Sequence, residues 1–328
     1  MEINSQSQLV LEQMNQWGQE KSPFAFLIDF ECNKPLCWKL EAPKSPFKFN
    51  FQGIKNYADA PTNNINSKSV PFAFTPRPIS LEAYKVKFDG VKREIEYGNS
   101  FLVNLTVETP IVTNYTLEQL FILAKAKYTC WLKDNFVCFS PETFVQIKNG
   151  QIFSYPMKGT IDASIPNAEA LLLNDAKEIA EHVTIVDLIR NDLSRVSENV
   201  HVSRFRFYEE LKTQDGLLGQ ISSEIVGQLP SDYATRIGTL IFDLLPAGSI
   251  SGAPKAKTEK IIFEAEQAQR GYYTGVAGYF DGTNLDSCVL IRYLQADGTY
   301  RSGGGITFQS ELQKEYQEMI NKIYVPIF

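Results

Sequence analysis

Histidine is scarce in this chain, and the chain carries no excess of positive charge. Each of these features argues against a class of function. Only two histidines occur among 328 residues, His182 and His201, which excludes a histidine-rich metal site and gives little support to a Ser-His-Asp triad. Lysine and arginine number 32 against 38 aspartates and glutamates, so the formal net charge is −6. Because this balance leaves no basic footprint, we expect no nucleic-acid partner.

Cysteine patterns and long apolar runs are missing as well. The five cysteines are odd in number and widely spaced, unlike those of a disulfide framework or a zinc site. None lies in a Gly-x-Cys-x-Gly turn, so we see no glutamine-hydrolysing unit. No run of eighteen apolar residues occurs, and the N-terminus has no basic segment followed by an apolar one. These features predict a cytoplasmic protein without a membrane partner.

Hydrophobic residues make up 44% of the chain, enough for one large domain or two closely packed halves. Periodicity and cap residues predict strands at 24–30, 101–113, 272–281 and 285–296, and helices at 80–97, 167–195, 231–242 and 254–267, with a last helix from about residue 310. Residues 42–78 lack clear periodicity and predict long loops. Because consecutive strands are mixed with helices without βαβ alternation, we expect an α+β fold of antiparallel sheets with outer helices.

A predicted hairpin with an Asn149-Gly150 turn leads to the segment Pro156-Met157-Lys158-Gly159-Thr160. Lys158 is therefore expected at a strand terminus. A lysine there is commonly solvated, but a desolvated lysine has a lowered pKa and can attack carbon. The neighbouring residues alone do not decide between the two.

Two glutamate pairs with three-residue spacing are candidates for a metal site. Glu178 and Glu181 share one face of a predicted helix, and Glu315 and Glu318 repeat the spacing on the last predicted helix. If the two faces met, their oxygens would suit Mg²⁺, which needs few protein ligands because it keeps waters and substrate oxygens. A single pair of this kind is more often a solvated helix face.

Three further features could contact an anion. Gly303, Gly304 and Gly305 would let backbone N–H groups approach closely, or they form a flexible turn. Ser249 lies shortly before a helix opened by Pro254, where capping chemistry alone also explains it. Arg292, in an apolar segment, either faces water or turns inward to pair with a carboxylate.

Six motifs in order carry a resemblance to a known family. They are SPETF, YPMKGT, AKEIAEHVTIVDLIRNDLSRV, PAGSISGAPK, RGYYTGVAGYF, and GGGIT followed by EYQE. Together, over residues 80–325, they closely resemble the chorismate-utilising enzymes. The resemblance implies one catalytic domain over 1–328, with 1–79 a shortened N-terminal part of it. It also implies a two-lobed α+β fold of large antiparallel sheets packed face to face with helices outside.

The resemblance also implies roles for the candidate residues. Glu181 and Glu318 would bind Mg²⁺ directly, and Glu178 and Glu315 would support them. One chorismate carboxylate would complete the Mg²⁺ shell. The other would meet an anion site made of Arg292, Tyr273 and the N–H groups of Gly303, Gly304 and Gly305.

The residue at position 158, a lysine, distinguishes between the reactions of the family. Anthranilate synthases typically have Pro-Ile-Ala-Gly-Thr at this motif, whereas aminodeoxychorismate synthases have Pro-Ile-Lys-Gly-Thr, which the chain resembles. The implied reaction is amination of chorismate at C4 with ammonia from a glutamine amidotransferase subunit, for para-aminobenzoate and folate synthesis. Lys158 would be the nucleophile, Glu142 would move protons, and Ser249 would contact the leaving hydroxyl or the enolpyruvyl group.

One departure from the family pattern leaves alternatives open. Gln220 stands where the family commonly has a histidine, and glutamine cannot act as a general acid. A non-catalytic chorismate-binding subunit therefore stays as a competing hypothesis, and an anthranilate synthase component is a second enzyme alternative, against which Lys158 argues.

Overall fold

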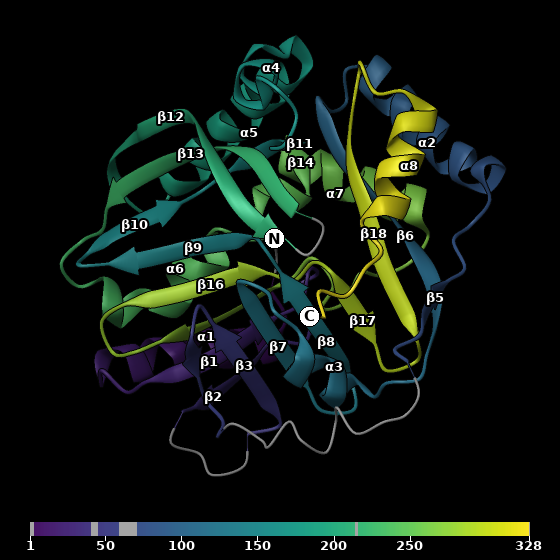
Figure 1. Ribbon diagram of the computed structural model, residues 1–328. Coiled ribbons are helices and arrows are strands. Elements are labelled where there is room, and N and C mark those ends of the chain that lie inside the picture. The colour runs from purple at the N-terminus through teal and green to yellow at the C-terminus, as the bar shows by residue number, and fades with distance from the viewer. Residues whose placement is uncertain (1–2, 41–44, 59–70, 214–215, 328) are drawn as a thin grey trace.

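In the part of the chain that the structure describes, two nine-stranded sheets with antiparallel strand pairs form the framework of the protein (Figure 1). The structure, a computed structural model, describes residues 3–40, 45–58, 71–213 and 216–327. The first sheet has the order β11-β13-β10-β9-β16-β15-β1-β2, with β12 paired to β13. The second has the order β14-β6-β18-β17-β8-β7-β3-β4, with β5 paired to β6.

The strands of the first sheet are β1 (Phe24–Ile28), β2 (Leu36–Lys39), β9 (Thr143–Lys148), β10 (Gln151–Ser154), β11 (Met157–Asp162), β12 (Glu198–Thr213), β13 (Gly216–Gln228), β15 (Val276–Phe280) and β16 (Leu285–Val289). Those of the second are β3 (Phe47–Phe51), β4 (Ile54–Lys55), β5 (Phe74–Pro76), β6 (Leu102–Thr113), β7 (Tyr128–Leu132), β8 (Phe136–Ser140), β14 (Gly252–Ala253), β17 (Tyr293–Gln295) and β18 (Thr299–Thr307).

The helices are α1 (Ser5–Gln19), α2 (Leu81–Glu96), α3 (Leu117–Leu123), α4 (Ala168–Asn174), α5 (Ala176–Leu193), α6 (Ile237–Asp243), α7 (Lys255–Glu266) and α8 (Leu312–Asn321). Within the described residues, short 3₁₀ turns cover Tyr233–Arg236 and Gly248–Ile250. No helix in the described segments is long and apolar enough to cross a bilayer.

The sheets pack face to face through an aromatic layer. Ala25 and Leu27 of β1 belong to a buried cluster that also contains Phe49 of β3. The ring of Phe49 stacks on that of Tyr279 in β15, with centroids 5.5 Å apart, which joins the two sheets directly. This arrangement confirms the predicted α+β fold of packed antiparallel sheets.

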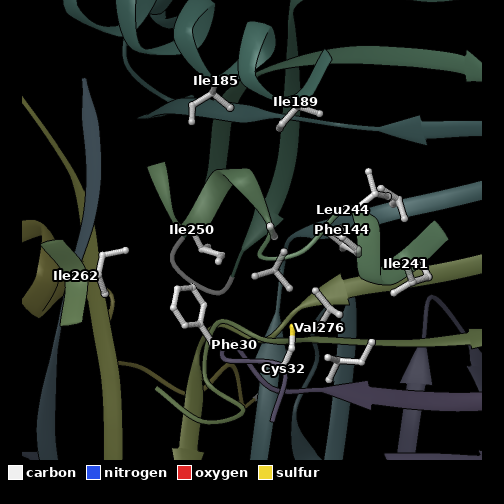
Figure 2. Close-up of a cluster of buried hydrophobic side chains, with 14 of the residues drawn as sticks. Phe30, Cys32, Phe144, Ile185, Ile189, Ile241, Leu244, Ile250, Ile262 and Val276 are labelled. Atoms are coloured by element: carbon white, nitrogen blue, oxygen red, sulfur yellow. The ribbon is translucent and has the colours of Figure 1, made fainter. Parts of the chain in front are cut away.

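A second, larger core lies between the sheets and their outer helices. Figure 2 shows Ile185 and Ile189 of α5, Ile241 of α6 and Val276 of β15 converging with Phe30, which follows β1. Because β1 alternates, its remaining side chains face this core while Ala25 and Leu27 face the other sheet.

Most predictions based on local signals are confirmed. The helix predicted at 80–97 is α2, with Ser80 as its N-cap and Gly98 at φ +76° after its end. Asn149 and Gly150 both have positive φ, as the two-residue turn between β9 and β10 requires. Helical structure at 167–195 is also confirmed, with a break at Asp175 between α4 and α5.

Two predictions are wrong. Residues 42–78 are not all loops, because β3, β4 and β5 lie there; 42–44 and 59–70 are outside the described residues. Burial alternates along Phe47–Phe51, a period that the surrounding prolines and lysines obscured. The single strand predicted at 285–296 is instead broken around Arg292, where the chain crosses from the first sheet to the second.

The capping box that opens α3 supports a first prediction. Thr116 accepts a hydrogen bond from the backbone N–H of Gln119, whose side chain accepts from the N–H of Thr116. Thr116→Ala should lower the free energy of unfolding by about 1 kcal/mol, because one amide of the first turn loses its acceptor. Urea denaturation measures this, and an unchanged midpoint would contradict it.

Candidate functional site

Lys158 is the second residue of β11, opposite Ile221 of β13, so the prediction of a strand terminus is close to the observed position. Its Nζ lies 3.6 Å from Glu181 Oε2 of α5, and the two side chains are 23% and 11% exposed. The next residue, Gly159, has φ +76°, and a Cβ there would lie 3.0 Å from Glu178 Oε2. This part of β11 therefore lies directly beside the first glutamate pair.

The three glycines belong to β18 and do not form a flexible turn. Gly303 pairs with Thr106 of β6, and Gly305 pairs with Asn104. A Cβ on Gly305 would lie 3.4 Å from Lys158 Nζ, whereas one on Gly304 would lie 2.9 Å from Glu318 Oε1 and 3.5 Å from Glu315 Oε2. The glycine segment thus runs between the lysine and the second glutamate pair.

A methyl group at Gly304 should disturb the site more than the fold. Gly304→Ala should reduce affinity for a divalent cation about tenfold, because the Glu318 carboxylate must move away from the new Cβ. Manganese titration followed by electron paramagnetic resonance measures the affinity. Gly90→Ala in α2, where a Cβ meets nothing within 4 Å, is the control. Equal affinity in both variants would contradict the prediction.

Lys322, just after α8, is a site residue that the sequence reasoning missed. Its Nζ donates to Glu318 Oε1 at 2.5 Å and to the carbonyl oxygen of Gly303 at 2.9 Å. Burial lowers the pKa of the Lys322 amine, while the charge of Glu318 opposes that shift. Its position four residues after Glu318, one helical turn on, was the available signal.

Glu142 and Ser249 meet although 107 residues separate them. Glu142 lies between β8 and β9, and its Oε1 accepts a short hydrogen bond from Ser249 Oγ in the 3₁₀ turn Gly248–Ile250. Burial raises the pKa of the Glu142 carboxyl, while this hydrogen bond and the charge of Lys158 act in the opposite direction. Burial therefore favours a carboxyl that carries a proton it can donate.

Arg292 lies close enough to Glu142 and to Tyr273 for its charge to act on both. The Arg292 guanidinium lies 5.2 Å from the ring centre of Tyr324. Tyr273 is buried, and burial raises its pKa to about 12, so its hydroxyl stays protonated. Arg292 thus places positive charge near Glu142, with the neutral Tyr273 close to it.

Gln220 lies on strand β13, and His182 lies on helix α5. The Gln220 amide nitrogen donates to Met157 Sδ at 3.2 Å and to Ser222 Oγ at 3.3 Å. His182 is almost fully buried, and its Nε2 contacts Ser223 Oγ at 2.7 Å. Burial lowers the pKa of His182 to about 4, so the imidazole is neutral and joins α5 to β13.

The glutamates and the neighbouring cations suit a hard metal ion completed by other ligands. Within the described residues, no three histidine, cysteine or acidic side chains group closely enough to hold a metal by themselves. Mg²⁺ does not require this, because waters and substrate oxygens fill most of its octahedral shell. The site residues named so far include five carboxylates (Glu142, Glu178, Glu181, Glu315 and Glu318) and three cations (Lys158, Arg292 and Lys322), a formal charge of −2 when all are ionised. The donor set therefore fits a divalent cation.

A pocket of about 200 Å³ opens beside this site. Its lining includes Glu181, Leu102 of β6 and the exposed side chains of Phe101 and Phe308. Glu181 of the first glutamate pair thus lies on the wall of a pocket that exposed side chains also line.

Comparison with known proteins agrees with this geometry. The sequence model of the chorismate binding enzymes matches residues 16–327. The chain belongs to this enzyme family. It is 51% identical, over 97% of its length and 98% of the relative, to an uncharacterized PabA-like protein of Pasteurella multocida.

Family members with named reactions are more distant. Aminodeoxychorismate synthase component 1 of Bacillus subtilis is 31% identical over 75% of this chain and 55% of the relative. Anthranilate synthase component 1 of Acetivibrio thermocellus is 33% identical over 81% and 56%, so the chain matches about half of each of these relatives. The menaquinone-specific isochorismate synthase of Escherichia coli shares the fold, with a TM-score of 0.70, 17% identity and coverage of 97% and 80%.

Proposed function

We propose that this member of the family aminates chorismate at C4 to give 4-amino-4-deoxychorismate, as an Mg²⁺-dependent synthase subunit of para-aminobenzoate and folate synthesis. The position of Lys158 carries the proposal. Its amine lies between Glu181 and the glycine segment of β18, and its charge also acts on the buried Glu142. An amine among acid groups that can move protons is equipped for nucleophilic catalysis.

The proposed substrate is a dianion, so its binding needs positive charge in an acidic protein. Glu181 and Glu318 would hold Mg²⁺, with Glu178 and Glu315 in support, and one substrate carboxylate would complete the metal shell. Bound Mg²⁺ would supply Lewis-acid stabilisation of charge on the substrate. The second carboxylate would meet the Arg292 guanidinium, the Tyr273 hydroxyl and the N–H groups of β18.

The proposed chemistry is two successive displacements. The Lys158 nitrogen bonds to C2, both ring double bonds shift (C1=C2 to C1=C6 and C5=C6 to C4=C5), and the C4–O bond breaks. Glu142 gives its proton to the departing hydroxide, which leaves as water, while Ser249 stays hydrogen-bonded to this carboxyl. The Glu142 carboxylate then takes the proton that the alkylated Lys158 nitrogen loses. Ammonia bonds to C4, both double bonds shift back, and the C2–N bond breaks as Glu142 returns its proton to the leaving nitrogen, which restores the lysine amine.

The ammonia would come from a glutamine amidotransferase subunit. The sequence has no Gly-x-Cys-x-Gly nucleophile turn of its own, and a relative of known reaction is named as component 1 of its synthase. The free cysteines of the described segments fit a reducing, cytoplasmic setting. The glutamine amidotransferase subunit is therefore the partner that we propose for this chain.

Anthranilate synthesis is the second candidate, because an anthranilate synthase component is 33% identical to the chain. That reaction needs no lysine nucleophile, so the Lys158–Glu181 contact would have no catalytic purpose. Gln220, which cannot act as a general acid, instead favours a third candidate, a non-catalytic chorismate-binding subunit.

One incubation and one isothermal titration with chorismate separate the three candidates. The purified chain is mixed with chorismate, Mg²⁺ and an ammonium salt, and products are identified by mass spectrometry. We expect 4-amino-4-deoxychorismate. Fluorescent anthranilate and pyruvate would support the second candidate, and Mg²⁺-dependent chorismate binding without any product would support the third.

A further inference from the structure

Two lysines pair with the two glutamates that would bind the metal directly. Lys158 contacts Glu181 from β11, and Lys322 donates to Glu318 one helical turn away. The contacts are 3.6 Å and 2.5 Å long, and the side chains of Lys322 and Glu318 are 29% and 47% exposed. Each glutamate of the proposed direct ligand pair therefore already has a cationic partner within the chain.

The Lys322 contact is held from two sides. The same amine donates to the carbonyl oxygen of Gly303 in β18, so β18 and α8 together fix its position. A divalent cation that bound Glu318 would approach this ammonium group, and the two positive charges would repel each other across a partly buried site. Binding of the cation thus requires the ammonium group to move or the repulsion to be overcome.

We propose that Lys322 and Lys158 act as built-in counter-cations, which hold Glu318 and Glu181 in place without metal and compete with Mg²⁺ for them. The proposal rests on the metal site of the proposed function. It assigns Lys322 a positioning role toward the metal, separate from any contact with the reacting ring. Affinity for the metal alone is weak as a result, and it rises when substrate carboxylates compete for the ammonium groups.

The test measures cation binding to the chain without substrate. Mn²⁺ is the probe, followed by electron paramagnetic resonance, in the wild type and in Lys322→Met, Lys158→Met and Lys322→Arg. Lys322→Met should bind Mn²⁺ about tenfold more tightly, and Lys158→Met less so because its contact is longer. Lys322→Arg keeps the positive charge and should stay near the wild-type affinity.

The matched control is Lys314→Met. Lys314 also lies on α8 and pairs with a glutamate, Glu311, at 2.7 Å, but both side chains are well exposed. This variant removes the same net charge without touching the site, so its Mn²⁺ affinity should not change. Equal tightening in Lys314→Met and Lys322→Met would overturn the proposal, since it would show an effect of overall charge.

Other outcomes are equally decisive. Unchanged or weaker Mn²⁺ binding in Lys322→Met would overturn the proposal, and thermal unfolding checks that the variant is folded. With chorismate present, Mn²⁺ affinity should rise more in the wild type than in Lys322→Met, and an equal rise would count against competition. Because the first titration uses no substrate and detects no product, absence of amination would leave its result standing.

Discussion

Lys158→Ala is expected to reduce the rate of 4-amino-4-deoxychorismate formation about 10³-fold, because the covalent route is lost and only direct displacement by ammonia is left. The Lys158 amine is placed for this role by Glu181, 3.6 Å away, and by Gly305, whose missing Cβ leaves room beside it. Turnover is measured as product per enzyme by liquid chromatography and mass spectrometry, at saturating chorismate, Mg²⁺ and ammonium.

Lys314→Ala is the control for Lys158→Ala, since it removes an exposed lysine from α8 and should keep full turnover. Circular dichroism and urea unfolding of both variants test whether the fold is intact. A Lys158→Ala enzyme with unchanged turnover would refute the nucleophile role. A large loss in the control would mean that general charge, and not the amine of Lys158, sets the rate.

Arg270→Met should lower the free energy of unfolding by about 3–5 kcal/mol, because it leaves the buried carboxylate of Glu266 without its cation. Arg270 is 1% exposed, and its guanidinium donates to both Glu266 oxygens at 2.6 and 3.0 Å. It also donates to the carbonyl oxygens of Ile250 and Asn104 at 2.8 and 2.7 Å. One side chain thus ties α7 to β6 and to the turn that carries Ser249.

Urea denaturation measures the effect of Arg270→Met. Arg190→Met is the matched control, because Arg190 pairs with Asp187 at 2.8 Å on the surface of α5, and its loss should cost about 0.5 kcal/mol or less. Replacing Arg270 and Glu266 together by methionine should recover part of the loss, since no buried charge is then left alone. A cost below about 1 kcal/mol for Arg270→Met would contradict this account of the pair.

Features decided by neighbouring residues could be predicted from the sequence. Ser80 caps its helix as expected, and Asn149-Gly150 forms the expected turn, because caps and turns depend on a few adjacent residues. The motif order also indicated the family and the α+β class, which the fold and the family match confirm. The strand Phe47–Phe51 was missed because its alternating pattern is short and lies among turn-forming residues.

The assembly of the site could not be predicted from the sequence, because its contacts join segments that are distant along the chain. The sequence by itself determined which residues carry acid, amine and guanidinium groups, and it determined the local caps, turns and glutamate spacing. Only the tertiary structure put Lys158 against Glu181, Ser249 against Glu142, and Gly304 beside Glu318. The physical reason is that sheet register and helix packing bring these groups together. Burial then shifts their pKa values and strengthens the electrostatic interactions between them.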